Sequence, residues 1–335
     1  MKIREIEELL YDDSPDMLES LAQRAAALTR QRFGRGIQMF APVYISNECV
    51  DTCSYCAFSR SNQIQRRTLA PEQVEQEASF LIAQGFRHLL LVAGEHPRAV
   101  SIDYLCAVAR RLRPQLASLS IEVAPFDETA YRLLTSAGID GVVIYQETYN
   151  RDRYLAVHQA GPKRDYDNRL RAPERAASGG ARRIGMGILL GLAEWQQDAL
   201  QLIEHVRFLQ KRYWQVEFQV SLPRLRPCFG GLTDIVPVSD HALVQLICLL
   251  RLALPEVGIV LSTRESPQFR DNVLPLGVTQ LSAGSRTEPG GYREPNLAEE
   301  QFSIGDHRSA QEVAGMIAKR NLEAVWKDWE ASLYG

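Results

Sequence analysis

Short apolar segments alternate with longer amphipathic segments along most of the chain. Each short segment is a run of largely apolar residues, which is typical of a parallel strand buried on both faces. Eight such runs are predicted to be strands, at residues 43–46, 88–92, 119–123, 141–145, 185–190, 216–222, 258–262 and 278–282. The pattern therefore predicts an α/β protein.

The segments between these strands carry apolar residues at helical spacing. Helices are predicted at residues 71–84, 102–112, 127–137, 166–177, 195–212, 240–254, 267–275 and 309–320. A helix at 15–33 precedes them, with Ser14 as its N-cap and Gly34 as its C-cap. Eight strand–helix repeats favour a single-domain (β/α)8 barrel of the TIM type, and a doubly wound open sheet is the alternative.

The barrel accounts for most of the 335 residues. We expect residues 1–40 to form an N-terminal helical extension and residues 41–335 to form the barrel with a C-terminal closing segment. Residues 285–300 of that segment are rich in Gly, Pro and charge, which indicates an extended loop. Active sites of such barrels lie at the C-terminal ends of the strands, so candidate residues are sought there.

Composition and charge exclude several classes of protein. Hydrophobic residues make up 45% of the chain and charged residues 24%, and the net charge is −3, as is ordinary for a soluble globular protein. No uncharged apolar run is long enough for a membrane helix, and the acidic N-terminus does not resemble a signal peptide. The charge balance offers nucleic acid no basic surface. We therefore expect a cytoplasmic protein that binds neither membrane nor nucleic acid.

Three of the six cysteines, Cys49, Cys53 and Cys56, follow the first predicted strand within one short loop. Clustered thiols in a reducing compartment more often bind metal than form disulfides. The C-x3-C-x2-C spacing favours a 4Fe-4S cluster whose fourth iron stays open for chemistry. A structural zinc site is the alternative, and it would need His88, His96 or a distant cysteine as its fourth ligand.

The cysteine motif, with the aromatic Tyr55 before its last cysteine, resembles the signature of the radical S-adenosylmethionine (SAM) superfamily. The resemblance implies that the open iron chelates the methionine moiety of SAM, and that the reduced cluster cleaves the sulfonium to a 5′-deoxyadenosyl radical. It places Tyr55 in the cofactor site. Gly94 and Glu95, after the second strand, match the superfamily motif that holds the amino group of SAM, with Ala93 as its one departure.

Polar residues at the ends of other strands are further candidates. Glu122, within an apolar run, is expected at the barrel mouth, where its carboxylate could accept hydrogen bonds from the ribose of SAM. Residues 145–149 bring consecutive polar positions to the end of the fourth strand. Of Arg169 and Arg175, on the next predicted helix, one could clamp a carboxylate, and Arg175 is assigned to SAM. Arginines after the last three strands would favour an anionic group: Arg224, Arg226, Arg264 and Arg286.

The likeness becomes more specific beyond the cysteines. Residues 44–47, 89–96, 143–149, 223–228, 261–267, 289–292 and 325–329 resemble the 2-iminoacetate synthase (ThiH) family, the tyrosine lyases of thiamine biosynthesis. This resemblance implies radical cleavage of the Cα–Cβ bond of L-tyrosine to 2-iminoacetate and p-cresol, with 5′-deoxyadenosine and methionine as co-products. It also implies a flavodoxin- or ferredoxin-type electron donor and a complex with the thiazole synthase.

Loop position assigns the remaining roles. Arg264, with Ser262 and Ser282, is expected to bind the carboxylate of tyrosine, since these residues lie at the ends of the last two strands. Ala57 stands where the family has glycine, and the N-terminus is shorter than is usual there, which bears on partner docking. The chain ends without the further cysteines of the related maturase that makes CO and cyanide, so that activity is not expected. A sister lyase for tryptophan or another amino acid and a non-enzymatic zinc module are the alternatives.

Overall fold

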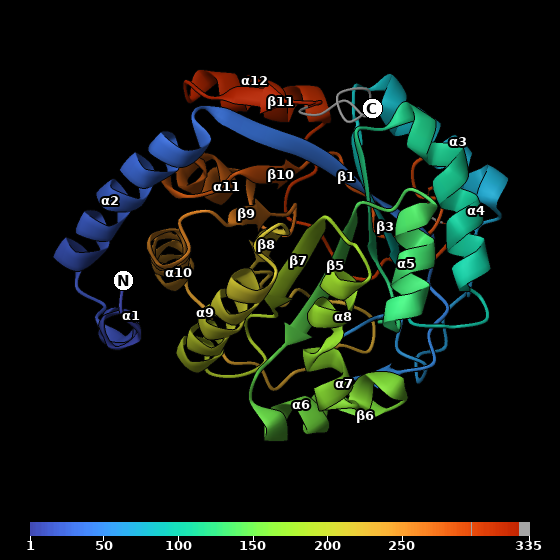
Figure 1. The fold of residues 1–335 in the computed structure, drawn as a ribbon, viewed down its shortest axis with the longest axis horizontal. Helices are drawn as coiled ribbons and strands as arrows, with labels where there is room; N and C mark the ends of the chain where they lie inside the picture. The colour runs from blue at the N-terminus through green and yellow to red at the C-terminus, as the bar shows by residue number, and fades with distance from the viewer. Residues whose placement is uncertain (296, 328–335) are drawn as a thin grey trace.

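The computed structural model describes residues 1–295 and 297–327. The barrel strands are β1 (Gly36–Ser46), β3 (His88–Ala93), β4 (Ser118–Glu122), β5 (Gly141–Glu147), β7 (Arg183–Ile188), β8 (Glu217–Ser221), β9 (Gly258–Leu261) and β10 (Gln280–Ser282). They are all parallel and follow one another in this order around the sheet, and β1 pairs with β10 to close it (Figure 1). The predicted (β/α)8 barrel is confirmed, because in an open sheet the first and last strands, β1 and β10, would not pair with each other.

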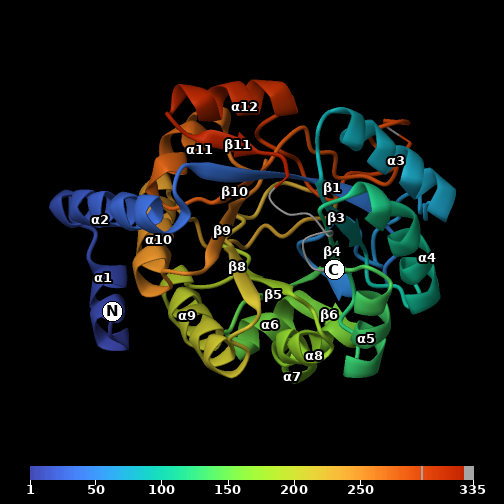
Figure 2. The ribbon, with the colours of Figure 1, turned by 45° about the horizontal axis from the view of Figure 1, so that its top comes forward.

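Helices surround the sheet on its outer face (Figures 1 and 2). They are α3 (Pro71–Ala83), α4 (Ile102–Leu112), α5 (Glu128–Ser136), α6 (Arg151–Val157), α7 (Tyr166–Leu170), α8 (Ala172–Ser178), α9 (Trp195–Arg212), α10 (Asp240–Ala253), α11 (Pro267–Val273) and α12 (Ala310–Lys319). Short 3-10 helices lie at Arg113–Gln115, Pro162–Arg164 and Leu274–Leu276. The helix predicted at 166–177 is divided into α7 and α8. Pro173, in the first turn of α8, lacks the N–H that a continuous helix would need there.

Two helices precede the barrel. Helix α2 (Pro15–Phe33) has the predicted bounds, and Gly34 ends it at a φ of 64°, a conformation that glycine adopts without strain. Helix α1 (Ile3–Tyr11) was not predicted, although Ile3, Ile6 and Leu10 have helical spacing. Its buried residues Ile6 and Leu10 pack against α9 and α10. None of the described helices is long and apolar enough to cross a membrane.

Strand β1 is much longer than the predicted 43–46, and the division expected at residue 40 falls inside it. Ile37, Met39 and Ala41 are buried at alternate positions of its first half. This half pairs with β11 (Glu323–Val325) from the far end of the chain, a contact that local sequence does not reveal. Two short strands, β2 (Thr52–Cys53) and β6 (His158–Ala160), were likewise not predicted and form a separate antiparallel pair.

The described part of the closing segment comprises residues 283–295 and 297–309. Its Asp306 forms a fully buried ion pair with Arg270 of α11. Arg308 extends the network, with Nη2 at 2.8 Å from Oδ1 of Asp271. The network joins the segment to α11, and removing one partner of the buried pair would leave an uncompensated buried charge, which is strongly destabilising. The segment thereby carries Gln301 and Phe302 to the barrel mouth.

Candidate active site

The loop after β1, residues 47–58, is the cysteine loop, and it is held at several points. Its β2 pairs with β6, which follows β5. The guanidinium of Arg66 donates hydrogen bonds to the carbonyls of Asn47 (2.6 Å) and Phe58 (2.8 Å), one at each end of the loop. The same guanidinium also donates to the carbonyls of Ser59 and Asn62. The cysteine loop therefore has a fixed shape, set by neighbours that lie well apart in sequence.

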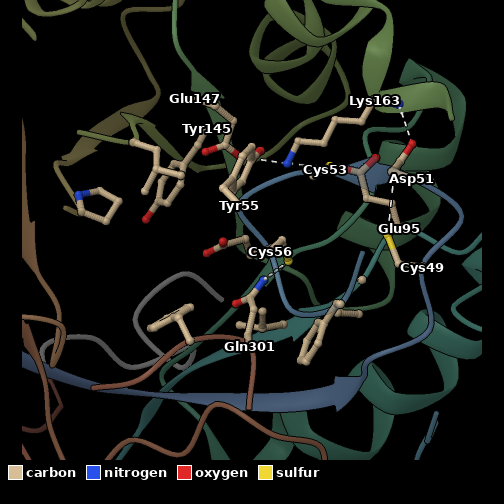
Figure 3. A pocket seen from close by; sticks show the side chains of 18 of the residues that line it. Cys49, Asp51, Cys53, Tyr55, Cys56, Glu95, Tyr145, Glu147, Lys163 and Gln301 are labelled. Atoms are coloured by element: carbon tan, nitrogen blue, oxygen red, sulfur yellow. Dashed lines mark hydrogen bonds and ion pairs between the residues drawn. The ribbon is translucent and has the colours of Figure 1, made fainter. Parts of the chain in front are cut away.

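The three cysteines line one pocket at the C-terminal ends of the strands, as Figure 3 shows. Most of the predicted site residues meet there: Cys49, Cys53, Cys56, Tyr55, Gly94, Glu95, Glu122 and Arg264. All three cysteines are free thiols. Burial raises the pKa of each thiol, that of Cys49 to about 12, so a bound metal must displace the protons.

The chemistry of the donors fits a 4Fe-4S cluster better than zinc. Among the described residues, no group of three or more His, Cys, Asp or Glu side chains could hold a single metal ion. His88 begins β3 at the opposite end of the barrel, with Nδ1 2.8 Å from Oγ of Ser118. Nδ1 of His96 accepts a hydrogen bond from its own loop, from the N–H of Ala99. Three thiols on one loop, each of which could bind a different iron, match the ligands of a cluster with one open iron.

Gly94 lies where the loop after β3 meets the cysteine loop. A Cβ atom at this position would stand 2.4 Å from the carbonyl oxygen of Glu48 and 3.1 Å from Cβ of Cys49. The two loops are also joined by a hydrogen bond of 2.9 Å from the N–H of Val50 to the carbonyl of Glu95. Only glycine allows this approach. Glycine at residue 94 is therefore required by the packing of the two loops, in addition to its expected role in binding SAM.

Four charged side chains form a buried network at the inner wall of the pocket. Nζ of Lys163 lies 2.8 Å from Oε1 of Glu147, and Nη1 of Arg169 lies 2.7 Å from Oε1 of Glu95. Burial raises the pKa of Glu147, but Lys163 and Arg169 outweigh it, and this pKa lies below its ordinary value. Glu147 also has a φ of 71°, a strained conformation that is concentrated at functional sites.

Two charged groups on the pocket wall have no such partner. Within the described residues, the side chains of Glu122 and Arg264 form neither a hydrogen bond nor an ion pair. Burial, and then Glu147, raises the pKa of Glu122 to about 7, while Arg264 lowers it. Burial lowers the pKa of Arg264, whose guanidinium carbon lies 3.3 Å from the centroid of the Phe302 ring. The pocket thus presents one unpaired carboxyl and one unpaired guanidinium to a ligand.

The pocket lining does not include Arg175, Ser262 or Ser282, nor the candidate arginines Arg224 and Arg286. The guanidinium of Arg175 donates to the carbonyls of Phe126 (2.9 Å) and Asn168 (3.0 Å), and Arg169 lines the pocket instead. Oγ of Ser262 accepts a hydrogen bond from the N–H of Arg264. Oγ of Ser282, buried, accepts one from the N–H of Thr263. Both serines therefore shape the loop that presents Arg264.

Several pocket residues were not predicted. Lys163 lies in the short 3-10 helix Pro162–Arg164, whose sequence carries no recognisable motif. Gln301 and Phe302 reach the pocket from the closing segment, far from the cysteines in sequence. Asp51, between two ligands, is fully buried, and its Oδ1 accepts a hydrogen bond of 2.8 Å from the N–H of Lys163. Of these residues, only Asp51 could have been predicted from the sequence, because it lies within the cysteine motif.

The fold and the site together define the class. A closed parallel barrel with three cysteines of this spacing at its mouth, beside a Gly-Glu loop, is the arrangement of a radical SAM enzyme, which holds a 4Fe-4S cluster and SAM. Residues 43–206 match the Radical SAM superfamily, and residues 221–323 match the Biotin and Thiamin Synthesis associated domain.

Similarity to individual proteins is more specific. The chain is 45% identical to the 2-iminoacetate synthase of Escherichia coli (strain K12) and 44% identical to that of Salmonella typhimurium (strain LT2), in each case over 97% of this chain and 86% of the relative. It superposes on the [FeFe]-hydrogenase maturase HydG of Carboxydothermus hydrogenoformans with a TM-score of 0.91 and 34% identity, over 96% of this chain and 75% of that one. The chain belongs to the 2-iminoacetate synthase family and is a radical SAM carbon–carbon lyase. Of the stretches that carried this resemblance, Asp328 and Trp329 lie outside the described residues.

Proposed function

We propose that the enzyme cleaves the Cα–Cβ bond of L-tyrosine to give 2-iminoacetate and p-cresol, with 5′-deoxyadenosine and methionine as co-products. When bound, the cluster and SAM supply the 5′-deoxyadenosyl radical, which takes a hydrogen atom from the amino group of the substrate. The protein binds and orients the two ligands and excludes water. The product is the imine used for the thiazole ring of thiamine.

The unpaired guanidinium of Arg264 is the observation that carries this proposal. A partly buried cation without an anionic partner is unfavourable unless a ligand supplies the compensating negative charge. The planar fork of arginine matches a carboxylate with two parallel hydrogen bonds. The Phe302 ring lies against the guanidinium, with its centroid 3.3 Å from the guanidinium carbon. An amino-acid substrate would place its carboxylate there.

The walls of the pocket suit the rest of the substrate. Leu189, Leu225 and Phe302 contribute apolar surface, and Tyr145 contributes an aromatic ring. Aromatic side chains of a ligand pack favourably against such surfaces. A phenol ring is therefore accommodated better than a charged side chain.

The cofactor roles follow from position. Cys49, Cys53 and Cys56 ligate three irons. Gly94 and Glu95 hold the amino group of SAM, and Tyr55 lies against the cofactor. Glu122 accepts hydrogen bonds from the ribose, and its lack of a protein partner supports this role. Arg169, rather than the predicted Arg175, contributes to the cofactor site, since its side chain lines the pocket.

An anaerobic turnover assay with SAM, a reductant and tyrosine tests the proposal. The expected products are p-cresol and one 5′-deoxyadenosine for each tyrosine consumed. The same preparation should release little or no methylindole from tryptophan. A preparation that cleaves SAM with another amino acid, and yields no p-cresol from tyrosine, would establish the sister-lyase alternative. Full activity with zinc and no iron would exclude the cluster.

The partners are also proposed. A flavodoxin- or ferredoxin-type protein supplies two electrons per turnover, one for the cleavage of SAM and one, with a proton from solvent, for the hydroxybenzyl fragment that becomes p-cresol. The thiazole synthase receives the unstable imine. The free thiols of all six cysteines support a reducing compartment, and we place the enzyme in the cytoplasm. Co-purification of the tagged enzyme with thiazole synthase under anaerobic conditions is the direct test of the second partner.

A further inference from the structure

Gln301 brings a hydrogen-bond donor to one of the three cysteine ligands. Its Nε2 lies 3.7 Å from Sγ of Cys56, and its Oε1 accepts a hydrogen bond of 2.8 Å from the hydroxyl of Tyr44. Figure 3 shows the amide directed at the sulfur from the side of the pocket opposite Lys163. In the described part of the chain, no other side-chain N–H donates to a sulfur of these ligands. The three ligand sulfurs are therefore not equivalent.

The backbone of Gln301 is fixed on both sides. Its N–H donates a hydrogen bond of 2.9 Å to the carbonyl of Thr287, and its carbonyl accepts one of 3.4 Å from the N–H of Ala57. Ala57 directly follows Cys56, so the closing segment is joined to the cysteine loop beside the ligand itself. The amide is thus aimed at the sulfur by its anchored main chain.

Tyr44 determines which end of the amide faces the sulfur. A thiolate can only accept hydrogen bonds, so the NH2 group of Gln301 must face Cys56 and Oε1 must face a donor. The hydroxyl of Tyr44 is that donor, and this residue of β1 is buried, with its ring packed edge-on against Phe58. A flipped amide would set an oxygen against the sulfur.

We propose that Gln301 tunes the bound cluster by donating a hydrogen bond to the ligand sulfur of Cys56, with Tyr44 as the positioning residue, so that the cluster is reduced at a higher potential than without it. One-electron reduction adds negative charge to the cluster and its thiolates. An N–H donor at a ligand sulfur stabilises the reduced form more than the oxidised form. The electron comes from an external reductant, and no substrate takes part.

A redox titration of the reconstituted enzyme tests this proposal. Dithionite is added anaerobically, and the reduced cluster is followed by electron paramagnetic resonance, without tyrosine. Gln301→Leu is expected to shift the reduction equilibrium about tenfold toward the oxidised form, which lowers the midpoint by about 59 mV for a one-electron couple. Tyr44→Phe, which leaves the donor but frees the amide, should give a smaller shift in the same direction.

Gln63→Leu is the matched control, because Gln63 is an exposed glutamine shortly after the cysteine loop that forms no hydrogen bond within the described residues. Its midpoint should equal that of the wild type. A wild-type midpoint in Gln301→Leu, at equal iron content, would overturn the proposal. If that variant fails to retain iron, a wild-type midpoint in Tyr44→Phe overturns it instead. Because the titration needs no turnover, its result is independent of the proposed tyrosine reaction.

Discussion

Nζ of Lys163 lies 2.8 Å from Oε1 of Glu147, and both side chains are almost completely buried at the wall of the pocket. The pair joins the loop after β6 to the end of β5. Lys163→Met would leave Glu147 and Glu95 with Arg169 as their remaining cation. Breaking a buried pair on one side costs about 3–5 kcal/mol. Chemical denaturation should show a loss of this size in the free energy of unfolding, together with weaker SAM binding.

Arg151→Met is the control for this variant. Arg151 pairs with Asp167 at 2.7 Å, but both side chains are more than half exposed. Exposed pairs contribute less than about 1 kcal/mol. Equal losses in the two variants would contradict the assignment of a special role to the buried pair.

Gly94→Ala tests the close approach of two loops. The added Cβ would stand 2.4 Å from the carbonyl of Glu48, so the cysteine loop must shift. We expect iron content after reconstitution to fall, and SAM binding to weaken at least tenfold. Iron analysis and equilibrium dialysis measure the two effects.

Gly315→Ala provides the comparison for Gly94→Ala. Gly315 lies in α12, and a Cβ there meets no atom within 4 Å. Alanine is favoured over glycine in a helix by about 0.8–1.0 kcal/mol, so this variant should be slightly more stable and retain its iron. Iron retention by Gly94→Ala at the level of Gly315→Ala would show that the loops tolerate a methyl group.

The sequence predicted those features of the molecule that are encoded locally. Each barrel strand is centred on an apolar run, and the three ligands share one short loop, so both could be recognised without a structure. Lys163 and Gln301 could not, because long-range contacts bring them to the pocket. Local sequence also could not determine whether Arg169 or Arg175 faces the cofactor site. Both lie on the same predicted helix, and the break between α7 and α8 determines which one faces the site.

The ionisation of Glu122 should be visible in SAM binding. Its pKa of about 7 lies above the ordinary value of 4.5, so its ionisation opposes folding, and its contribution to stability falls as pH rises from about 4.5 to 7. The carboxylate is, however, the better acceptor for ribose hydroxyls. SAM affinity is therefore expected to rise about tenfold between pH 6 and 8.

Glu122→Gln separates this effect from the titration of SAM itself. The amide keeps an acceptor oxygen but does not ionise, so the pH dependence due to residue 122 should disappear, while that of the ligand remains. Calorimetric dissociation constants at several pH values supply the comparison. Parallel pH profiles of SAM affinity for wild type and variant would show that Glu122 does not bind the ribose.

Arg264→Ala should act on the substrate rather than on the cofactor. A hydrogen bond to a charged group contributes about 1.5–3 kcal/mol, so kcat/KM for tyrosine should fall roughly 10- to 150-fold. Arg264→Lys keeps the charge but loses the planar fork, and an intermediate loss is expected. Substrate-free SAM binding should change little in Arg264→Lys, which keeps the positive charge that lowers the pKa of Glu122.

Arg286→Ala is the matched control for Arg264→Ala. Both arginines follow the last strands and were expected to favour an anion, but Arg286 is exposed and does not line the pocket. Its KM for tyrosine should match that of the wild type. Tyramine, which lacks the carboxylate, gives a second test, because it should bind wild type and Arg264→Ala equally well. If Arg264→Ala weakened tyramine and tyrosine binding alike, the guanidinium would have a role other than holding the carboxylate.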